Sequence, residues 1–354
     1  MSPSPRIGLL VMAYGTATDP SEVMEYYTHI RHGHAPSQEV VDELAGRYAQ
    51  LPGGRSPLLE ITTDQMNAIA DAVRAQGVDL AAVELGQKHS APFIEDGVAA
   101  LIEAGVGRII GIVLAPHWST MSVAEYLGRA RRTAAELKPE LSLDLVADWH
   151  LAGGYIDWLT AAVQRALLQI PAEHRAGTEV LFTAHSLPVR ILQENDPYPV
   201  SLKETAAAVA EQAGIDLWST GWQSAGQTAT PWLGPDLLEI LPAKKAEGRS
   251  GVVVCACGFV SDHLEVLYDL DIETKGAAGE LGLAFARTDM PNDDAPFIAT
   301  LAGVVLEAIA QPPGPSAAEQ AAADKHATHT GKPEHAGRPG ARGTLTEEQP
   351  APQA

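Results

Sequence analysis

Short apolar runs alternate along the chain with longer segments that have helical patterns rich in Ala, Glu, Leu and Arg. The runs are long enough for single strands, and their apolar residues are nearly continuous. Two sets of four runs occur, at residues 7–12, 82–86, 108–115 and 143–147, and then at 179–184, 217–222, 251–257 and 281–286. The pattern therefore predicts a strand and helix alternation that is repeated twice.

Near-continuous apolar strands between helices are typical of a buried parallel sheet. We therefore predict an α/β protein with two similar doubly wound (Rossmann-like) lobes, each with a four-stranded parallel sheet flanked by helices. The predicted lobes are residues 1–150 and 151–311, and the last helix of the second lobe is able to pack back on the first. From 312 to 354 the composition changes to Pro, Gly, Ala and scattered charges, which predicts a disordered tail.

Ligands of such folds bind beyond the carboxyl ends of the strands, and polar residues gather there in this chain. His185 directly follows one predicted strand, where an imidazole could serve as a general base, a metal ligand or a structural partner for turn carbonyls. The nucleotide-binding motifs G-x-G-x-x-G and G-x-x-x-x-G-K-[ST] and the hydrolase motif G-x-S-x-G are absent. Dinucleotide binding and serine hydrolase chemistry are therefore weak interpretations.

Acidic residues recur every fourth position after the strand that ends near residue 257. On a helix, Glu265, Asp269 and Glu273 would form one stripe about 12 Å long. The stripe is either a solvated acidic face or a path for cations or protons, because hard cations prefer oxygen ligands. With Asp262 as N-cap, Glu265 would also complete a capping box.

Composition limits the classes of partner. The chain has 354 residues, 45% of them apolar and 19% charged, which is typical of a globular protein. A net charge of -21 without clustered Lys and Arg argues against nucleic acid and against anionic membrane surfaces. The apolar runs are too short to span a bilayer and no signal-peptide pattern is present, so we expect a cytoplasmic protein without integral membrane association.

Cysteine use limits the cofactors. Cys255 and Cys257 lie two apart in an apolar run, where buried free thiols are expected. An iron–sulfur cluster that is held by four cysteines is excluded by their number.

Two motifs together carry a resemblance: Ala184-His185-Ser186-Leu187-Pro188 and Gly258-Phe259-Val260-Ser261-Asp262-His263-Leu264-Glu265. Five further segments contribute to the same resemblance: Val11 to Thr16, Tyr26 to Arg31, Ser56-Pro57-Leu58, Leu114 to His117 and Gly221 to Ser224. The chain resembles the ferrochelatases over about residues 6 to 310, and most of all the soluble bacterial enzymes that act on coproporphyrin III. The resemblance implies a porphyrin cleft between the lobes and insertion of Fe(II) into coproporphyrin III in haem biosynthesis.

The resemblance also implies roles for individual residues. His185 and Glu265 would be the catalytic pair and would contact the metal, and Asp269 and Glu273 would form an outer metal site. The porphyrin would be bound by Tyr14, Arg31, Arg47, Ser56 and Tyr126. Coproporphyrin III and ferrous iron would be the partners, with transient contact to neighbouring haem-pathway enzymes. No cofactor would be required, because iron is a substrate and the tail lacks the cysteines that hold a cluster in some relatives.

Other functions stay open at this stage. A His and Glu pair does not select one divalent metal, so insertion of cobalt or nickel, or action on protoporphyrin IX or another tetrapyrrole, is an alternative. A non-catalytic tetrapyrrole-binding protein with two lobes is a further one.

Overall fold

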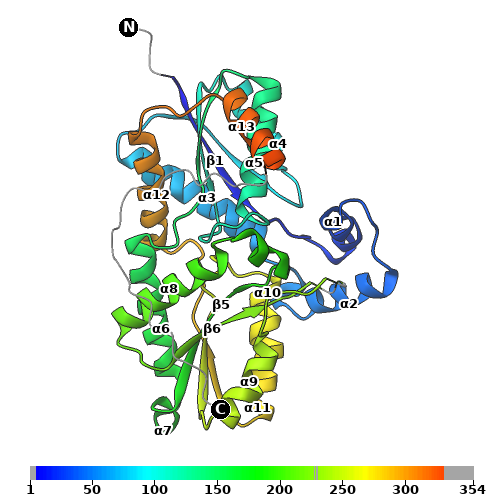
Figure 1. Cartoon of the computed structure of the whole chain (residues 1–354), viewed down its shortest axis with the longest axis vertical. Helices are drawn as coiled ribbons and strands as arrows, with labels where there is room; N and C mark the ends of the chain where they lie inside the picture. Colours follow the sequence, from blue (N-terminus) through cyan, green and yellow to red (C-terminus); the bar gives the residue numbers. More distant parts are fainter. Residues whose placement is uncertain (1–4, 227, 229, 331–354) are drawn as a thin grey trace.

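The protein has two lobes stacked along its longest axis (Figure 1). This computed structural model describes residues 5–330 apart from 227 and 229. Each lobe is built around one four-stranded parallel sheet, with helices on both faces. The predicted fold, two similar doubly wound lobes, is confirmed.

The two sheets have the same strand order, in which the second strand lies at one edge and the first and third are central. The first sheet, in the order β2-β1-β3-β4, contains β1 (Ile7–Ala13), β2 (Leu80–Gln87), β3 (Arg108–Val113) and β4 (Ser142–Val146). The second, in the order β6-β5-β7-β8, contains β5 (Thr178–His185), β6 (Trp218–Gln223), β7 (Gly251–Cys255) and β8 (Ala284–Arg287).

Strand β8 departs most from the prediction, because it begins at Ala284 rather than at residue 281. Leu281 is the C-cap of the preceding helix, and Gly282 takes a φ of 64°. This left-handed conformation ends the helix and suits glycine. The apolar residues just before β8 therefore belong to a helix end.

Helices cover both faces of each sheet. Those around the first sheet are α3 (Leu58–Ala75), α4 (Ile94–Glu103), α5 (Val123–Leu137), α12 (Ala295–Ala310) and α13 (Ala317–Thr330). Those around the second are α6 (Gly153–Gln169), α7 (Ala172–Arg175), α8 (Tyr198–Ala213), α9 (Leu237–Ala246) and α11 (Lys275–Glu280). Short 3-10 turns are η1 (Pro20–Glu22), η2 (Pro52–Gly54) and η3 (Val189–Glu194).

Alternate residues of β1 enter two different cores, as the two-residue period of a strand requires. Leu10 and Met12 pack in a core that also contains residues of α4 and α5. Leu9 and Val11 pack in a larger core that continues through Phe182 of β5 into the second lobe. The two lobes are therefore joined by one continuous apolar interior.

Helix α12 joins the lobes as well, because it packs against α3 of the first lobe and α6 of the second. The Arg108 guanidinium donates to the carbonyl oxygens of Ala308, Ile309 and Gln311 at the end of this helix, at 2.9 to 3.0 Å. These bonds satisfy carbonyls that a helix end leaves without partners. After the second sheet, the chain thus returns to the first lobe.

The prediction of a disordered tail from residue 312 is wrong as far as residue 330, because this segment contains α13. Ala317 is fully buried in the core of the first lobe, and Asp324 pairs with Arg131 of α5 at 3.1 Å. The start of α13 is a capping box, in which Ser316 and Glu319 each bind the other's backbone N–H. Small alanines let this segment dock without long apolar side chains. The rest of the predicted tail, 331–354, lies outside the described residues.

Helices α1 (Val23–Ile30) and α2 (Gln38–Ala49) project beside the junction of the lobes (Figure 1). Val23, Val41 and Tyr48 form a small core that also contacts Leu264 and Leu267 of the second lobe. This unit therefore closes one side of the space between the lobes. In the part of the chain that is described, no helix combines the length and the apolar character needed to cross a membrane.

Candidate active site

A cavity of about 460 Å³ lies between the two lobes. Its walls come from strand ends of both sheets, from α2 and α5, and from the loop and short helix that follow β7. Apolar and aromatic side chains make up most of the lining, with a few polar groups among them. Such a cavity suits a large, mostly apolar ligand that is oriented by a few polar contacts.

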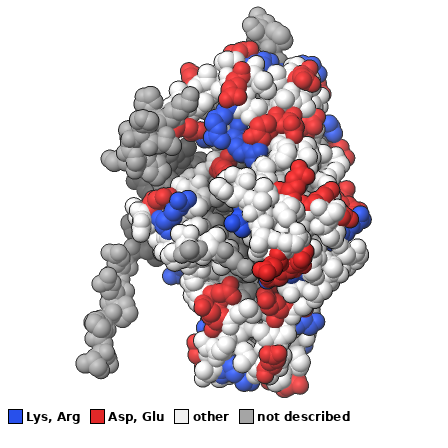
Figure 2. Space-filling view, turned by 90° about the vertical axis from the view of Figure 1, so that its right-hand side faces the viewer, with Lys and Arg blue, Asp and Glu red and all other residues white. Residues whose placement is uncertain are grey.

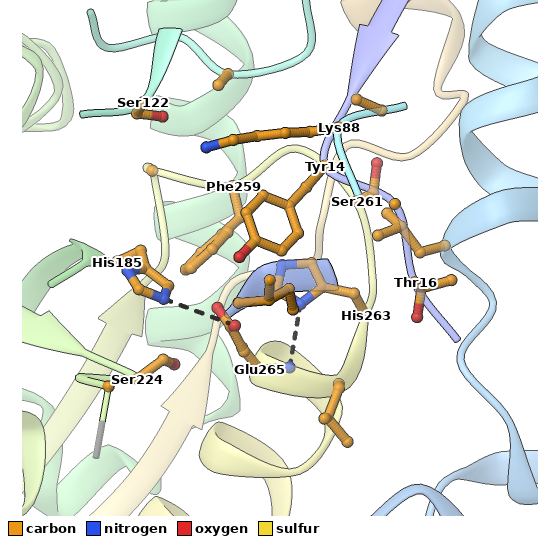
Figure 3. A pocket seen from close by; sticks show the side chains of 18 of the residues that line it. Tyr14, Thr16, Lys88, Ser122, His185, Ser224, Phe259, Ser261, His263 and Glu265 are labelled. Carbon is orange, nitrogen blue, oxygen red and sulfur yellow. Dashed lines mark hydrogen bonds and ion pairs between the residues drawn. The ribbon is translucent and has the colours of Figure 1, made fainter. Parts of the chain in front are cut away.

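His185 and Glu265 face each other on the wall from the second lobe (Figure 3). His185 is the last residue of β5, and Glu265 lies in the single turn α10 (Leu264–Leu267). The distance from Nε2 of His185 to Oε1 of Glu265 is 3.7 Å, and each side chain is 31% exposed. The structure thus brings the predicted catalytic pair together inside the cavity.

The tautomer of His185 follows from its backbone contact. Nδ1 of His185 binds the carbonyl oxygen of Ser186, which can only accept, so Nδ1 carries the proton. The lone pair of Nε2 is then directed toward Glu265. Burial lowers the pKa of His185, so the imidazole is neutral at pH 7 and able to accept a proton.

Burial acts in the opposite direction on the acids. It raises the pKa of Glu265 from 4.5 to about 8. Burial and the neighbouring Glu265 raise the pKa of Asp269 to about 7. Both carboxyl groups can therefore take up and release protons near neutral pH.

His263 fixes the start of α10. Its Nδ1 accepts the backbone N–H of Glu265 at 3.0 Å, so His263 is the N-cap. The prediction that Asp262 caps this helix in a capping box with Glu265 is wrong. The Asp262 carboxylate instead binds Arg287 and Asn292, on the side away from the cavity.

The three stacked acids do not lie on one regular helix. After α10 the chain forms a π-helix, η4 (Asp269–Thr274), which changes the angle between successive side chains. Glu265 lines the large cavity, Asp269 borders both this cavity and a smaller one of about 170 Å³, and Glu273 lines only the smaller one. The predicted straight stripe is wrong, and the three acids are instead distributed in sequence order over two neighbouring cavities that share Asp269.

Asp269 has one neutral and one cationic partner. Its Oδ2 accepts a hydrogen bond from Ser224 at 2.6 Å, and its Oδ1 is 3.8 Å from the Arg47 guanidinium. Arg47 also pairs with Glu43 at 2.9 Å. Among the described residues, no group of three or more His, Cys, Asp or Glu is arranged to hold a metal ion. The outer metal site of Asp269 and Glu273 therefore stays a prediction.

The first lobe supplies the opposite wall. Tyr14, directly after β1, is 41% exposed and reaches into the cavity together with Lys88 (Figure 3). The ammonium of Lys88 is 5.8 Å from the Tyr14 ring centre and 5.4 Å from that of Tyr126. It also pairs with Glu125 at 2.5 Å. Lys88 thus brings a buried cation to this wall.

The structure brings Tyr14, Arg47 and Tyr126 to the cavity but not the other two residues predicted to bind porphyrin. Arg31 is exposed at the end of α1 and does not line the cavity. Ser56 is buried, and its Oγ accepts the backbone N–H of Leu58 at 3.3 Å. The binding roles of Arg31 and Ser56 stay predictions.

Sequence reasoning gave no individual role to several residues of the cavity wall, among them Lys88, Ser224, Phe259 and His263. All four follow the carboxyl ends of predicted strands, so their position along the chain was the available signal. Their side-chain chemistry gave no further reason to select them.

The space-filling view shows how charge is distributed over one face (Figure 2). Acidic and basic side chains are mixed on this face, and a basic cluster lies directly beside an acidic one. A broad basic surface, which nucleic acid would require, is not seen there.

Comparison with known proteins identifies the family. A model described as ferrochelatase matches residues 6–309. A coproporphyrin III ferrochelatase from Halalkalibacterium halodurans is 43% identical over 308 residues, which cover 86% of this chain and 98% of that protein. One from Oceanobacillus iheyensis is 42% identical over 304 residues, which cover 85% and 96%.

Among solved structures, SirB from Bacillus subtilis with Fe3+ has a TM-score of 0.51 at 13% identity, covering 86% of this chain and 96% of that one. This likeness concerns the fold alone. The family match and the relatives both extend over most of the sequence. The chain belongs to the ferrochelatase family.

Proposed function

We propose that this ferrochelatase inserts Fe(II) into coproporphyrin III. One observation carries the proposal: a largely apolar cavity between the lobes has His185 and Glu265 on one wall and Tyr14 on the other. A flat macrocycle would fit between such walls. The choice of coproporphyrin III rests on the names of relatives that are more than 40% identical.

The four carboxylates of coproporphyrin need local positive charge, because the protein is acidic overall. Lys88 and Arg47 are the cationic side chains that line the cavity, where they also pair with Glu125 and Glu43. Charge-assisted bonds at short range can overcome a repulsive net field that salt screens. We propose that these two residues bind carboxylates, with Arg31 and Ser56 as further candidates.

Metal insertion releases two protons from the pyrrole nitrogens, one for each N–H that is lost. The unprotonated Nε2 of His185 is the available base, and Glu265 at 3.7 Å can exchange a proton with it. From Glu265, whose pKa is raised to about 8, protons can pass to Asp269, whose pKa is raised to about 7, and then to solvent. Burial of both acids therefore supports a proton path at neutral pH.

Fe(II) accepts both imidazole and carboxylate ligands, so His185 and Glu265 can also bring the metal to the ring. We propose that iron acts as a substrate and that the reaction needs no resident cofactor. Among the described residues, both cysteines are buried and free.

We further propose that the enzyme works in the cytoplasm and contacts neighbouring haem-pathway enzymes transiently. The product keeps large apolar ring faces, and direct transfer shortens the time that these faces spend in water. These contacts are inferred from the chemistry of the product.

An anaerobic absorbance assay with purified protein, Fe(II) and coproporphyrin III tests the function. We expect metalloporphyrin formation, and a fall of about a hundredfold or more for His185→Ala. His34→Ala, which changes an exposed histidine, is the control and should keep full turnover.

Unchanged turnover in His185→Ala would contradict the mechanism. A shift of the porphyrin absorbance without turnover would indicate a binding protein instead. Competition against protoporphyrin IX, and replacement of Fe(II) by Co(II) or Ni(II), separates the other chelatase activities.

A further inference from the structure

The segment from Asp262 to Asp271 carries both acids of the proposed proton path but has little regular structure of its own. It consists of a loop, the single turn α10 and the start of the π-helix η4. One helical turn is not stable by itself, and π-helical turns are rare. The position of Glu265 must therefore be fixed by contacts from other elements.

Arg287, the last residue of β8, contacts this segment at two points that flank Glu265. Its Nε and Nη2 bind the two carboxylate oxygens of Asp271 at 2.7 and 2.8 Å. Its Nη2 is also 3.3 Å from Oδ1 of Asp262. One guanidinium therefore connects both ends of the segment, and its paired bonds to Asp271 fix orientation as well as distance.

A second set of bonds holds the Asp262 end. The Asn292 side chain donates to the Asp262 carboxylate and accepts the backbone N–H of Asp262, both at 2.8 Å. The fully buried Gln65 of α3 donates to the carbonyl oxygens of Asn292 and Val260, at 2.7 and 3.0 Å. Through Gln65, this end of the segment is tied to the first lobe.

The side chains of Arg287, Asp262 and Asp271 do not line the cavity, whereas Glu265 and Asp269 do. The Arg287 side chain is 17% exposed, and its carboxylate partners in the segment are Asp262 and Asp271. Arg287 is thus placed to hold the acids in position without contact with the ligand.

We infer that Arg287 is a positioning residue, which holds Glu265 against His185 by clamping Asp262 and Asp271. The functional part of this inference rests on the proposed metal insertion. Loss of the clamp lets the segment move, so Glu265 spends less time near Nε2 of His185. Porphyrin binding should change less, because Lys88 and Arg47, the cations proposed to bind its carboxylates, belong to the first lobe and not to this segment.

The test compares Arg287→Gln, Arg287→Lys and Asp271→Asn with Arg165→Gln. The control arginine pairs with Asp289 at 3.5 Å on the surface and does not contact the segment. We expect Arg287→Gln to lower kcat about tenfold or more and to leave KM for the porphyrin within about twofold. Arg287→Lys keeps the charge but not the paired geometry, so its kcat should be intermediate. Arg165→Gln should match the wild type.

Combining Arg287→Gln with Asp271→Asn tests whether the two residues act as one unit. The double variant should lose little more kcat than the worse single variant. Three results would overturn the inference: unchanged kcat in folded Arg287→Gln, a parallel loss of kcat and porphyrin affinity, or fully multiplicative losses in the double variant.

Amide hydrogen exchange provides a readout that needs no turnover. Peptides that cover residues 262–274 should exchange faster in Arg287→Gln, while those from the first sheet stay unchanged. If the wild type inserts no metal but residues 262–274 exchange faster in Arg287→Gln, the proposed function is wrong and the role of Arg287 in holding the segment is supported. If the wild type is active and exchange in 262–274 is unchanged, the clamp fails.

Discussion

Glu265 combines a chemical role with a cost to stability, because its carboxyl group is largely withdrawn from water. Burial raises its pKa from 4.5 to about 8. Between these values the folded protein keeps a proton that the unfolded chain releases. The free energy of unfolding therefore falls as pH rises through this range. The contribution of Glu265 to the free energy of unfolding is therefore greatest below pH 4.5 and is lost as pH rises to about 8.

Replacing Glu265 by Gln should therefore stabilise the protein while it stops turnover. Gln stays neutral, so we expect a gain of about 1 to 2 kcal/mol at pH 8.5, after allowance for the exposed part of the side chain, and little change at pH 5. Thermal melting at both pH values and the insertion assay measure these effects. A variant that melts lower at pH 8.5 would contradict the burial argument.

Lys88 leads to a prediction about substrate charge. It is the buried cation on the Tyr14 wall, so Lys88→Met should weaken carboxylate binding without changing the catalytic pair. We expect KM for coproporphyrin III to rise about tenfold, equal to one charge-assisted bond, and KM for a porphyrin with two carboxylates to rise less.

The effect of Lys88→Met on KM is compared with the effects of replacing two exposed arginines by Met. Arg55→Met should have no effect, because Arg55 pairs only loosely with Glu60 at 3.9 Å. Arg31→Met tests the sequence-based prediction, which gives Arg31 the same role as Lys88. Equal KM changes for both porphyrins in Lys88→Met would rule out carboxylate binding by this lysine.

At the scale of elements, the strands were predictable because buried parallel strands are nearly continuous apolar runs. Because the ends of these runs mark the ends of the strands, the residues that follow them could also be located, and His185 was found in this way. The π-helix η4 was not predictable, because its sequence also fits an ordinary helix. Its contact with Arg287 of β8, through Asp271, joins residues whose pairing the sequence pattern does not reveal. Lys88 was missed because a lysine at a strand end reads as a solvated group.

Helix α13 shows how a local signal can be overruled by composition. The Ser316 and Glu319 capping box was present in the sequence, but the surrounding Pro, Gly and Ala indicated disorder. Alanine has no side chain that marks a buried face, so apolar periodicity was not informative. The burial of Ala317 became evident only from the structure.

The docking of α13 can be tested with two adjacent alanines. Ala317→Glu places a charge in the core of the first lobe and should lower stability by about 1 to 3 kcal/mol, with a fall of a few degrees in Tm. Ala318→Glu changes an exposed position and is the matched control. Equal melting of both variants would mean that α13 contributes nothing to the stability of the lobe.

At the scale of the whole molecule, the continuous core explains why the cavity walls keep their spacing. Phe182 and Leu9 belong to one apolar interior that crosses the lobe junction. The sequence predicted two lobes but not this continuity, because the contacts join residues that are far apart in the chain. The cavity walls from the two lobes are therefore supported by the same hydrophobic core.

The net charge of -21 should act with opposite sign on the two substrates. A negative field slows the approach of an anionic porphyrin and speeds that of a metal cation. Added salt screens both effects, because the Debye length falls from about 30 Å at 0.01 M to about 10 Å at 0.1 M. We therefore expect kcat/KM for coproporphyrin III to rise with salt and kcat/KM for Fe(II) to fall, each by a few-fold.

Initial rates over this salt range, with one substrate varied and the other saturating, measure both trends. A neutral solute at equal osmolarity is the control, because it does not screen charge. If kcat/KM for the porphyrin instead falls with salt, local attraction by Lys88 and Arg47 outweighs the global field. The salt response of Lys88→Met distinguishes local attraction from the global field. If local attraction makes kcat/KM for the porphyrin fall with salt in the wild type, kcat/KM should rise with salt in Lys88→Met.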